Sequence, residues 1–512
     1  MDAMRVLMKR LSLAQAVRIA TIAVVLASSG AAPAATLDPE RCAAQQPRVE
    51  EALQDDRGSC LALASRRERR GYDGRFQACE ERAIARWNRR MRSVGCDLGG
   101  GSEETATGST GEAATAWVEL LGQTQQVSYR VIDGLAVLAG DILLGTEEEV
   151  RAGDERIRAR RASGLQTAQS VSIADFNWSK NIIPYVISGN ISTTVRNRIN
   201  EAVTHWNANT IVRLKPRAGE ADFVRFQLSP LGTISMSLLG QAPLVGEQPI
   251  FISSAASRGT VIHEIGHAVG LWHEQGHPDR DSSIYVDFLN IKLEYWPQYV
   301  VVPLADRSRG PFDFNSIMLY SAFGGIMASN PGIPVMTRND GTTWTSNETA
   351  LSTGDIIGVT RLAAKLDDLI TLKHKFRNDS AQLCMETVGV SPGSAIEGRT
   401  CGGSTGQRWL RYNHPDTKRQ LLISQKTGMC AEVPGGTNVV NTNLLQAPCA
   451  GVTRQAYSFT GKGLLGGSPF VIRNTQSGRC VSIEGPTTST RNVEQESCTP
   501  LNSKLKWHQE LF

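Results

Sequence analysis

Four residues near the middle of the chain have the types and spacing of a catalytic metal site. His263 and His267 are four residues apart, Glu264 follows the first of them, and His273 lies six residues after the second. Residues four apart on a helix project from one face, so the two imidazoles can share a metal ion. Gly270 can adopt a positive φ and end the helix, which lets the chain bring His273 back to the same metal. Three neutral imidazoles leave one position of a zinc ion open, as in catalytic zinc sites.

This set of residues predicts hydrolysis of a peptide bond with one Zn²⁺ ion as cofactor. Zinc lowers the pKa of its bound water to about 7 and polarises a carbonyl group. Glu264 is not needed as a ligand, so it is the candidate catalytic base that takes the water's proton and passes it to the leaving amine. An isolated HExxH stretch can also be an ordinary surface helix. Four of the chain's eight histidines lie between residues 263 and 277, and this clustering favours the metal site.

The elements around the motif must hold it in place, and their pattern is that of a compact α/β unit. An amphipathic helix is predicted over 194–207, where apolar residues recur on one side. Short apolar runs predict strands over 182–187, 223–228 and 249–252.

The motif and its continuation resemble the astacin family of zinc metalloproteases, within the metzincin clan. After His273 the chain continues with Glu274 and with Asp279-Arg280-Asp281, and residues 316–320 read Ser-Ile-Met-Leu-Tyr, similar to the family's Met-turn. The resemblance covers about 178–365. It implies an α+β fold: a metzincin-type two-lobed catalytic domain, assigned to 166–366, with a mixed sheet and a zinc-binding helix.

The resemblance also implies roles for three residues outside the ligand set. Met318 would form the apolar floor beneath the zinc, and Tyr320 would be a further ligand that swings away to stabilise the oxyanion. Glu274 would lie behind the site and receive a new N-terminus after processing. The chain departs from the family pattern at His277 and at Leu319. Since three imidazoles already supply the metal, His277 is expected beside the site rather than on it.

The N-terminal part is expected to be an export signal followed by a small helical segment. Basic residues, an apolar run and a small-residue site predict a signal peptide over 1–34 and a secreted protein. Residues 35–98 are predicted to be helical, and a helical hairpin would pair Cys42 with Cys96 and Cys60 with Cys79, although the other two connectivities stay open. Residues 99–116, rich in Gly, Ser and Thr, are predicted to be a linker.

Residues 117–165 are interpreted as a pro-region. Strands are predicted over 126–131 and 135–138, and the run Arg158–Arg161 is either a processing site or an exposed loop. Gly140-Asp141 resembles the FxGD motif of astacin pro-segments, with Leu138 in place of Phe. That resemblance implies that Asp141 binds the zinc in place of water and keeps the precursor latent. The alternative is a plain Gly-Asp turn.

The last part, 367–512, contains three repeats. The first cysteine of each pair recurs after 46 and then 50 residues, and each repeat closes on an aromatic residue. The pattern resembles the ricin B-type lectin domain, a β-trefoil, and implies one disulfide within each repeat. Candidate carbohydrate-binding residues are Glu386, Trp409 and Glu432, whereas Ser482 stands at the matching position of the third repeat. The predicted pairs are Cys384–Cys401, Cys430–Cys449 and Cys480–Cys498.

Composition limits the partners that can be expected. A net charge of +4 over 512 residues gives no nucleic-acid footprint. No stretch after the signal approaches the roughly 18 apolar residues of a spanning helix. The predicted partners are therefore a protein or peptide substrate and, through the trefoil, glycans. The alternative function is a lectin-like adhesion protein with a vestigial protease domain.

Overall fold

The computed structural model of the chain describes residues 111–120, 123–162, 178 and 181–511, apart from a few short gaps. Those gaps are 242–245, 289, 293–294, 296–297, 300, 302–309, 369–370, 462–468, 484–489 and 500–501. The predictions for the signal peptide, for the helical segment 35–98 and for its four cysteines lie outside the described residues. Among the described residues, no helix is long and apolar enough to cross a membrane.

The catalytic part is built on a mixed sheet, as predicted. Strands β9, β7, β5 and β6 lie next to one another in this order and run parallel, whereas β8 is antiparallel to β9 at the edge. The strands are β5 (Ile182–Ile187), β6 (Arg213–Pro216), β7 (Phe223–Leu228), β8 (Met236–Leu238) and β9 (Glu247–Ile252). The three predicted strands are thus confirmed, β9 with two more residues at its start.

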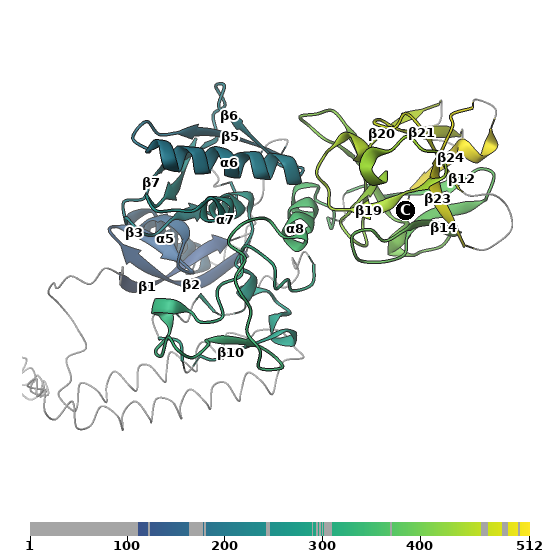
Figure 1. The fold of residues 1–512 in the computed structure, drawn as a ribbon. Coiled ribbons are helices and arrows are strands. Elements are labelled where there is room, and N and C mark those ends of the chain that lie inside the picture. Colours follow the sequence, from purple (N-terminus) through teal and green to yellow (C-terminus); the bar gives the residue numbers. More distant parts are fainter. Residues whose placement is uncertain are drawn as a thin grey trace, which may run out of the picture. The chain divides into compact units, whose positions relative to one another are not determined.

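Three helices complete this core: α6 (Thr193–Asn209), α7 (Arg258–Val269) and α8 (Thr353–Ala363). Helices α6 and α7 pack together and share one buried apolar cluster with the sheet (Figure 1). The indole N–H of Trp206 on α6 donates to the carbonyl oxygen of Ile262, and that of Trp178 donates to that of Ala268. Hydrogen bonds from two buried indoles to main-chain carbonyl groups therefore fix α7 and position the side chains that it carries.

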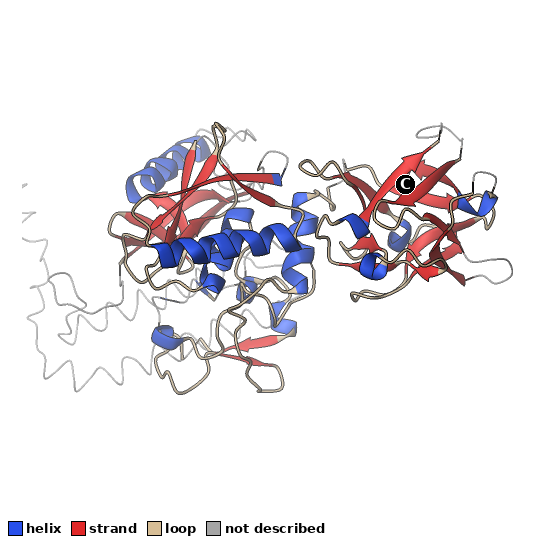
Figure 2. Cartoon of the chain, turned by 45° about the horizontal axis from the view of Figure 1, so that its top comes forward, coloured by secondary structure: helices blue, strands red, loops and turns tan. Residues whose placement is uncertain are grey.

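Between α7 and α8 the described residues of the catalytic part have little regular structure, as Figure 2 shows. Its regular elements are β10 (Ile284–Val286) paired with β11 (Met336–Arg338), and the short 3₁₀ helices η3 (Glu274–Gly276), η4 (Arg280–Ser282) and η7 (Gly325–Met327). A sheet-containing part and an irregular part on the two sides of the motif agree with the two-lobed α+β fold expected from the sequence.

The described residues of the segment interpreted as a pro-region form four strands and a helix. They are β1 (Glu112–Leu120), β2 (Gln123–Ile132), β3 (Leu135–Leu138), β4 (Ile142–Thr146) and α5 (Glu147–Ala162). Strands β1 to β4 form an antiparallel meander, and β4 pairs in parallel with β8, so the pro-region extends the catalytic sheet to nine strands. The strands predicted over 126–131 and 135–138 are confirmed.

One prediction for this region is wrong, and one of two open alternatives is excluded. Residues 112–116 belong to β1 and not to the linker, because they pair with residues 127–131 of β2. The run from Arg158 to Arg161 is not an exposed loop but the end of α5. Three glutamates in the first turn of α5 favour the helix through its dipole, and pairs such as Arg158–Asp154 support it along its surface.

The C-terminal part contains thirteen strands and three disulfides. Each disulfide lies within one repeat as predicted: Cys384–Cys401, Cys430–Cys449 and Cys480–Cys498. The strands are β12 (His374–Asn378), β13 (Leu383–Thr387), β14 (Ile396–Thr400), β15 (Trp409–Asn413), β16 (Gln420–Ser424), β17 (Cys430–Glu432), β18 (Thr442–Asn443), β19 (Leu445–Ala447), β20 (Ala456–Thr460), β21 (Phe470–Asn474), β22 (Cys480–Ile483), β23 (Thr490–Glu496) and β24 (Lys506–Leu511). Short 3₁₀ helices are η8 (Thr405–Gln407), η9 (Pro434–Gly436), η10 (Thr453–Gln455) and η11 (Ser503–Leu505).

Candidate active site

Helix α7 carries the first two imidazoles and ends where the third must return. Ser257 and Thr260 form a capping box at its start, and Gly270 ends it with φ 108°. The N–H of Gly270 donates to the carbonyl oxygens of Gly266 and His267. Only glycine adopts this left-handed conformation without strain. The turn sends the chain back toward the helix face, so that His273 lies beside His263, as the sequence predicted.

Four ligand atoms converge in front of this face. The Nε2 atoms of His263 and His273 are 3.2 Å apart. Asp141 Oδ2 lies 3.3 Å from Nε2 of His263, and its Oδ1 lies 3.4 Å from Nε2 of His267 and 3.1 Å from that of His273. Four atoms bound tetrahedrally to one Zn²⁺ ion at its usual distances lie about 3.3–3.4 Å from one another. The spacing of the three Nε2 atoms and the Asp141 carboxylate therefore fits one zinc ion.

The other nitrogen of two of the imidazoles is held by the main chain. His263 Nδ1 is 2.9 Å from the carbonyl oxygen of Ile317, and His267 Nδ1 is 2.9 Å from that of Leu271. A proton on Nδ1 satisfies each carbonyl and leaves the lone pair of Nε2 for a metal. Among the described residues, the buried Nε2 of His267 and Oδ1 of Asp141 have no hydrogen-bond partner. Such facing acceptor atoms are expected where a cation binds.

Glu264 lies beside the cluster and is 2% exposed. Burial, followed by the negative charge of Asp141, raises the pKa of its carboxyl group well above 4.5. Its Oε2 is buried and has no hydrogen-bond partner among the described residues. A buried carboxyl group with a raised pKa is suited to accept and return a proton.

Met318 and Tyr320, the two residues to which the Met-turn resemblance assigns roles, both lie near the ligand residues. A Cβ atom on Gly266 would come 2.8 Å from the Met318 sulfur, so this side chain packs directly against the turn of α7 between the two ligands. The ring of Tyr320 is 4.5 Å from that of His273, and its hydroxyl donates to the carbonyl oxygen of Ala139 at 2.8 Å. Burial and the charge of Asp141 raise the Tyr320 pKa well above 10, so the hydroxyl stays a donor.

Two buried residues that support the site were not predicted. Asp355, at the start of α8, accepts hydrogen bonds from the Ser316 hydroxyl at 2.6 Å and from the Ile317 N–H at 3.0 Å. It thereby fixes the residue whose carbonyl contacts His263. Gln275 is fully buried; its Oε1 accepts from the N–H of Tyr320. Gln275 directly follows Glu274 of the sequence motif, but the contacts of both residues depend on the tertiary fold.

Glu274 and His277 lie behind the ligands. Burial raises the pKa of Glu274 to about 8, and its Oε1 accepts a 2.7 Å hydrogen bond from the N–H of Asp313. Glu274 lines a cavity of about 610 Å³ together with residues that include His273, Met318 and Leu362. His277 Nε2 contacts the carbonyl oxygen of Gly310, not the ligand atoms, in agreement with the prediction that it stands beside the metal site.

The trefoil offers two carboxylates in equivalent surroundings. Glu386 accepts from the amide of Gln407 at 2.6 Å, and Glu432 accepts from that of Gln455 at 2.7 Å. In the third repeat these places hold Ser482 and Leu505.

Trp409, which was predicted as a carbohydrate-binding residue, lies in the core instead. It is fully buried, and its indole N–H donates to the carbonyl oxygen of Met385. Trp507 makes the same kind of bond to Val481 in the third repeat, so the aromatic residue of the repeat serves the core of the trefoil.

Two known protein families match the chain. The profile of the peptidase family "Astacin" matches residues 171–361, and that of the "Ricin-type beta-trefoil lectin domain" matches residues 372–507. The chain therefore contains a part that matches the astacin peptidase family, followed by a part that matches the ricin-type lectin domain.

Individual relatives match the catalytic part. Protein SpAN of Strongylocentrotus purpuratus is 32% identical over 229 residues, which are 42% of this chain and 36% of that protein. Zinc metalloproteinase nas-5 of Caenorhabditis elegans is 33% identical over 186 residues, 33% of this chain and 49% of that protein. The chain thus spans between a third and a half of the length of these relatives. Among solved structures, high choriolytic enzyme 1 of the medaka Oryzias latipes is 27% identical, with TM-score 0.31, and covers 35% of this chain and 86% of that chain.

Proposed function

We propose that the chain is a secreted zinc-dependent metalloendopeptidase that is made as a latent precursor. The observation that supports it best is the cluster of three imidazole Nε2 atoms and one carboxylate, all within 4.8 Å of one another, with Glu264 beside it. An adhesion protein with a vestigial protease domain has no need for a complete ligand set and a buried base. Zinc, when bound to His263, His267 and His273, supplies a Lewis acid and lowers the pKa of a water molecule to about 7.

In this mechanism each residue of the chain has one task. Glu264 takes the proton of the attacking water and returns it to the leaving nitrogen, which the raised pKa of its carboxyl group favours. Tyr320 stays protonated and donates its hydroxyl to the developing oxyanion once Ala139 has left it. Asp355 and Ile317 keep His263 in its orientation.

Latency would come from Asp141. Its carboxylate holds the position in which the water would otherwise lie, and burial, which alone would raise its pKa, is outweighed by the imidazoles of His273, His263 and His267. The pKa therefore lies well below 3.8, and the carboxylate is charged at any physiological pH. A charged carboxylate is a good zinc ligand, which supports this role over a plain turn.

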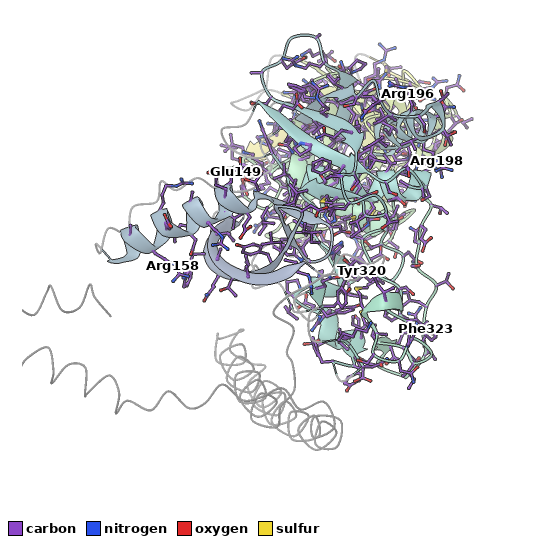
Figure 3. The ribbon with its side chains drawn as sticks, turned by 90° about the vertical axis from the view of Figure 1, so that its left-hand side faces the viewer. Glu149, Arg158, Arg196, Arg198, Tyr320 and Phe323 are labelled. Atoms are coloured by element: carbon purple, nitrogen blue, oxygen red, sulfur yellow. A yellow bond between two sulfur atoms is a disulfide. The ribbon has the colours of Figure 1, made fainter. Side chains whose placement is uncertain are left out.

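Processing near Arg158–Arg161 would separate the pro-region from the catalytic domain. Figure 3 shows Glu149 at the end of α5 nearest the body of the protein and Arg158 farther out along the helix. Proteases cleave extended chain, so a cut within α5 needs fraying of its last turn. A new α-amino group could then enter the cavity beside Glu274, where it would pair with a carboxyl group that burial now keeps from ionising.

Export and sugar binding complete the proposal. Three disulfides suit an oxidising compartment and agree with a signal peptide over 1–34. In the trefoil, Glu386 is the better candidate for a sugar hydroxyl acceptor, because Glu432 also forms a 3.0 Å ion pair with Arg454. Binding to a glycan array, compared between the wild type and Glu386→Ala, tests this part by itself.

The central experiment is hydrolysis of a denatured protein by the processed enzyme, with and without a zinc chelator. We expect activity that the chelator abolishes and that added Zn²⁺ restores. A processed protein that binds one zinc ion per chain but cleaves no peptide in a broad library would refute the proposed peptidase.

A further inference from the structure

A polar side chain from the irregular part of the catalytic domain, Gln298, borders the position next to the metal cluster. Gln298 is 8% exposed. A Cβ atom built on Gly140 would lie 2.8 Å from Oε1 of Gln298 and 2.9 Å from the hydroxyl oxygen of Tyr320. Gly140 directly precedes Asp141, whose carboxylate reaches the imidazoles. The main chain of the pro-segment therefore passes through a slot with Gln298 and Tyr320 as its walls.

Both walls of this slot are fixed by the same buried residue. The amide nitrogen of Gln275 donates to the carbonyl oxygen of Gln298 at 3.4 Å, and its Oε1 accepts from the N–H of Tyr320 at 3.3 Å. The guanidinium of Arg280 donates to the carbonyl oxygen of Gln275 at 2.8 Å. These bonds run through main-chain atoms of Gln298 and Tyr320, so a change of the Gln298 side chain leaves them in place.

The slot accommodates the main chain of the pro-segment, but it leaves no room for a side chain at the position of Gly140. Ala139 and Gly140 pass through it with φ values of 50° and 89°. The Tyr320 hydroxyl bonds to the carbonyl oxygen of Ala139, so a main-chain group is recognised while a Cβ on Gly140 is excluded. The residues after Asp141 run along β8 instead. The slot thus lies on the side of the metal cluster away from β8.

We propose that Gln298 is a specificity-determining residue of the peptidase. Together with Tyr320 it restricts the substrate residue next to the scissile bond, on the side away from β8, to glycine and other small residues. Its carboxamide also hydrogen-bonds to the substrate main chain there. This inference rests on the proposed peptidase function, because it assumes that a substrate takes the place of the pro-segment at the metal.

Three variants of the processed enzyme separate size from polarity: Gln298→Ala, Gln298→Met and Gln298→Glu. Cleavage of a peptide library, read by mass spectrometry, gives the preference at each position beside the bond. Gln298→Ala should admit larger residues at one flanking position, with kcat/KM for Leu relative to Gly there rising at least about tenfold, as methylene-sized changes in a pocket do. Gln298→Met keeps the volume and should keep the size restriction while raising KM. Gln298→Glu also keeps the volume and should keep the size restriction, but a carboxylate lacks the N–H donor of the carboxamide, so KM should rise in this variant too.

The results separate this inference from the proposed function. A wild type that cleaves peptides, together with an Ala variant whose size preference is unchanged and Met and Glu variants whose KM is unchanged, would overturn the role of Gln298 alone. A wild type that cleaves nothing would remove the proposed peptidase and this inference with it. If thermal unfolding shows that Gln298→Ala does not fold, the Met and Glu variants, which retain the side-chain volume, still decide the question through KM.

Discussion

Two separate contacts hold the pro-segment on the catalytic domain, and we predict that each contributes to latency. One is the carboxylate of Asp141 among the imidazoles. The other is strand β4 on β8, where Leu143 pairs with Leu238 and packs beside Met236 in a buried cluster. Asp141→Ala and Leu143→Ala should therefore each raise the activity of the uncleaved precursor, but neither should reach that of the processed enzyme.

The size of the Leu143 effect follows from its burial. Leu143 is 2% exposed, and its cluster contains residues from both the pro-region and the catalytic domain. Truncation of a buried leucine to alanine costs about 2–5 kcal/mol. If about 2 kcal/mol of this loss weakens the pairing of β4 with β8, the fraction of precursor in which β4 is detached rises about 30-fold. Asp141→Ala leaves this strand in place, so access to the metal stays restricted.

The assay is turnover of a quenched fluorescent peptide by precursor that mass spectrometry shows to be uncleaved. Val118→Ala is the matched control, because Val118 is buried in the pro-region on β1, the strand farthest from β8. Val118 lies in another buried cluster than Leu143, one that also contains Ile142 and Leu144, so this variant measures the effect of a general weakening of the pro-region. Equal activity of the Leu143 and Val118 variants would refute a docking role for β4. If the uncleaved Asp141→Ala precursor were as active as the processed enzyme, the contact of Asp141 with the imidazoles alone would account for latency.

Three further predictions concern chemistry and stability. Glu264→Gln should keep its zinc, measured by metal analysis, and its melting temperature, but lose about 10²- to 10⁴-fold in kcat; wild-type turnover would exclude Glu264 as the base. Asp355→Ala leaves three buried donors without their acceptor, at about 1–3 kcal/mol for each group, so the urea midpoint should fall well below that of the exposed control Asp340→Ala. Replacing Cys480 and Cys498 by serine should destabilise the trefoil by about 3 kcal/mol on the chain-entropy estimate, measured by calorimetry, and an unchanged transition would contradict it.

The metal ligands and the trefoil disulfides could be predicted because their signals are periodic. The spacing of His263 and His267 matches the pitch of a helix, and Gly270 is a recognisable helix end. Three cysteine pairs at similar spacing reveal a repeat in the amino-acid sequence alone. Each of these signals is contained in a single helix or a single repeat, so it can be recognised without knowledge of the rest of the fold.

What the sequence did not predict depends on contacts between distant segments. Strand β4 pairs with β8 about ninety residues later, and no local pattern indicates that partner. Helix α5 carries mostly charged residues, so it lacks the apolar stripe by which α6 was recognised. The prediction that Trp409 binds carbohydrate was wrong for a related reason. An aromatic residue in a lectin repeat suits a sugar site and a core equally well, and only its complete burial in the structure shows that it belongs to the core.

The imidazoles of the ligand set and the Tyr320 hydroxyl take part in both the proposed latency and the proposed catalysis. This limits how the precursor can be activated. Asp141 is directly followed by Ile142, the first residue of β4, so the strand cannot leave β8 without disturbing the carboxylate. A cut beyond α5 breaks none of the contacts of Asp141, of Ala139 with Tyr320 or of β4. It removes only the tether, and with it the high effective concentration of the pro-region. We therefore expect the cleaved pro-region to stay bound until dilution or a second cut within β1 to β4 releases it, with activity lagging behind the first cleavage.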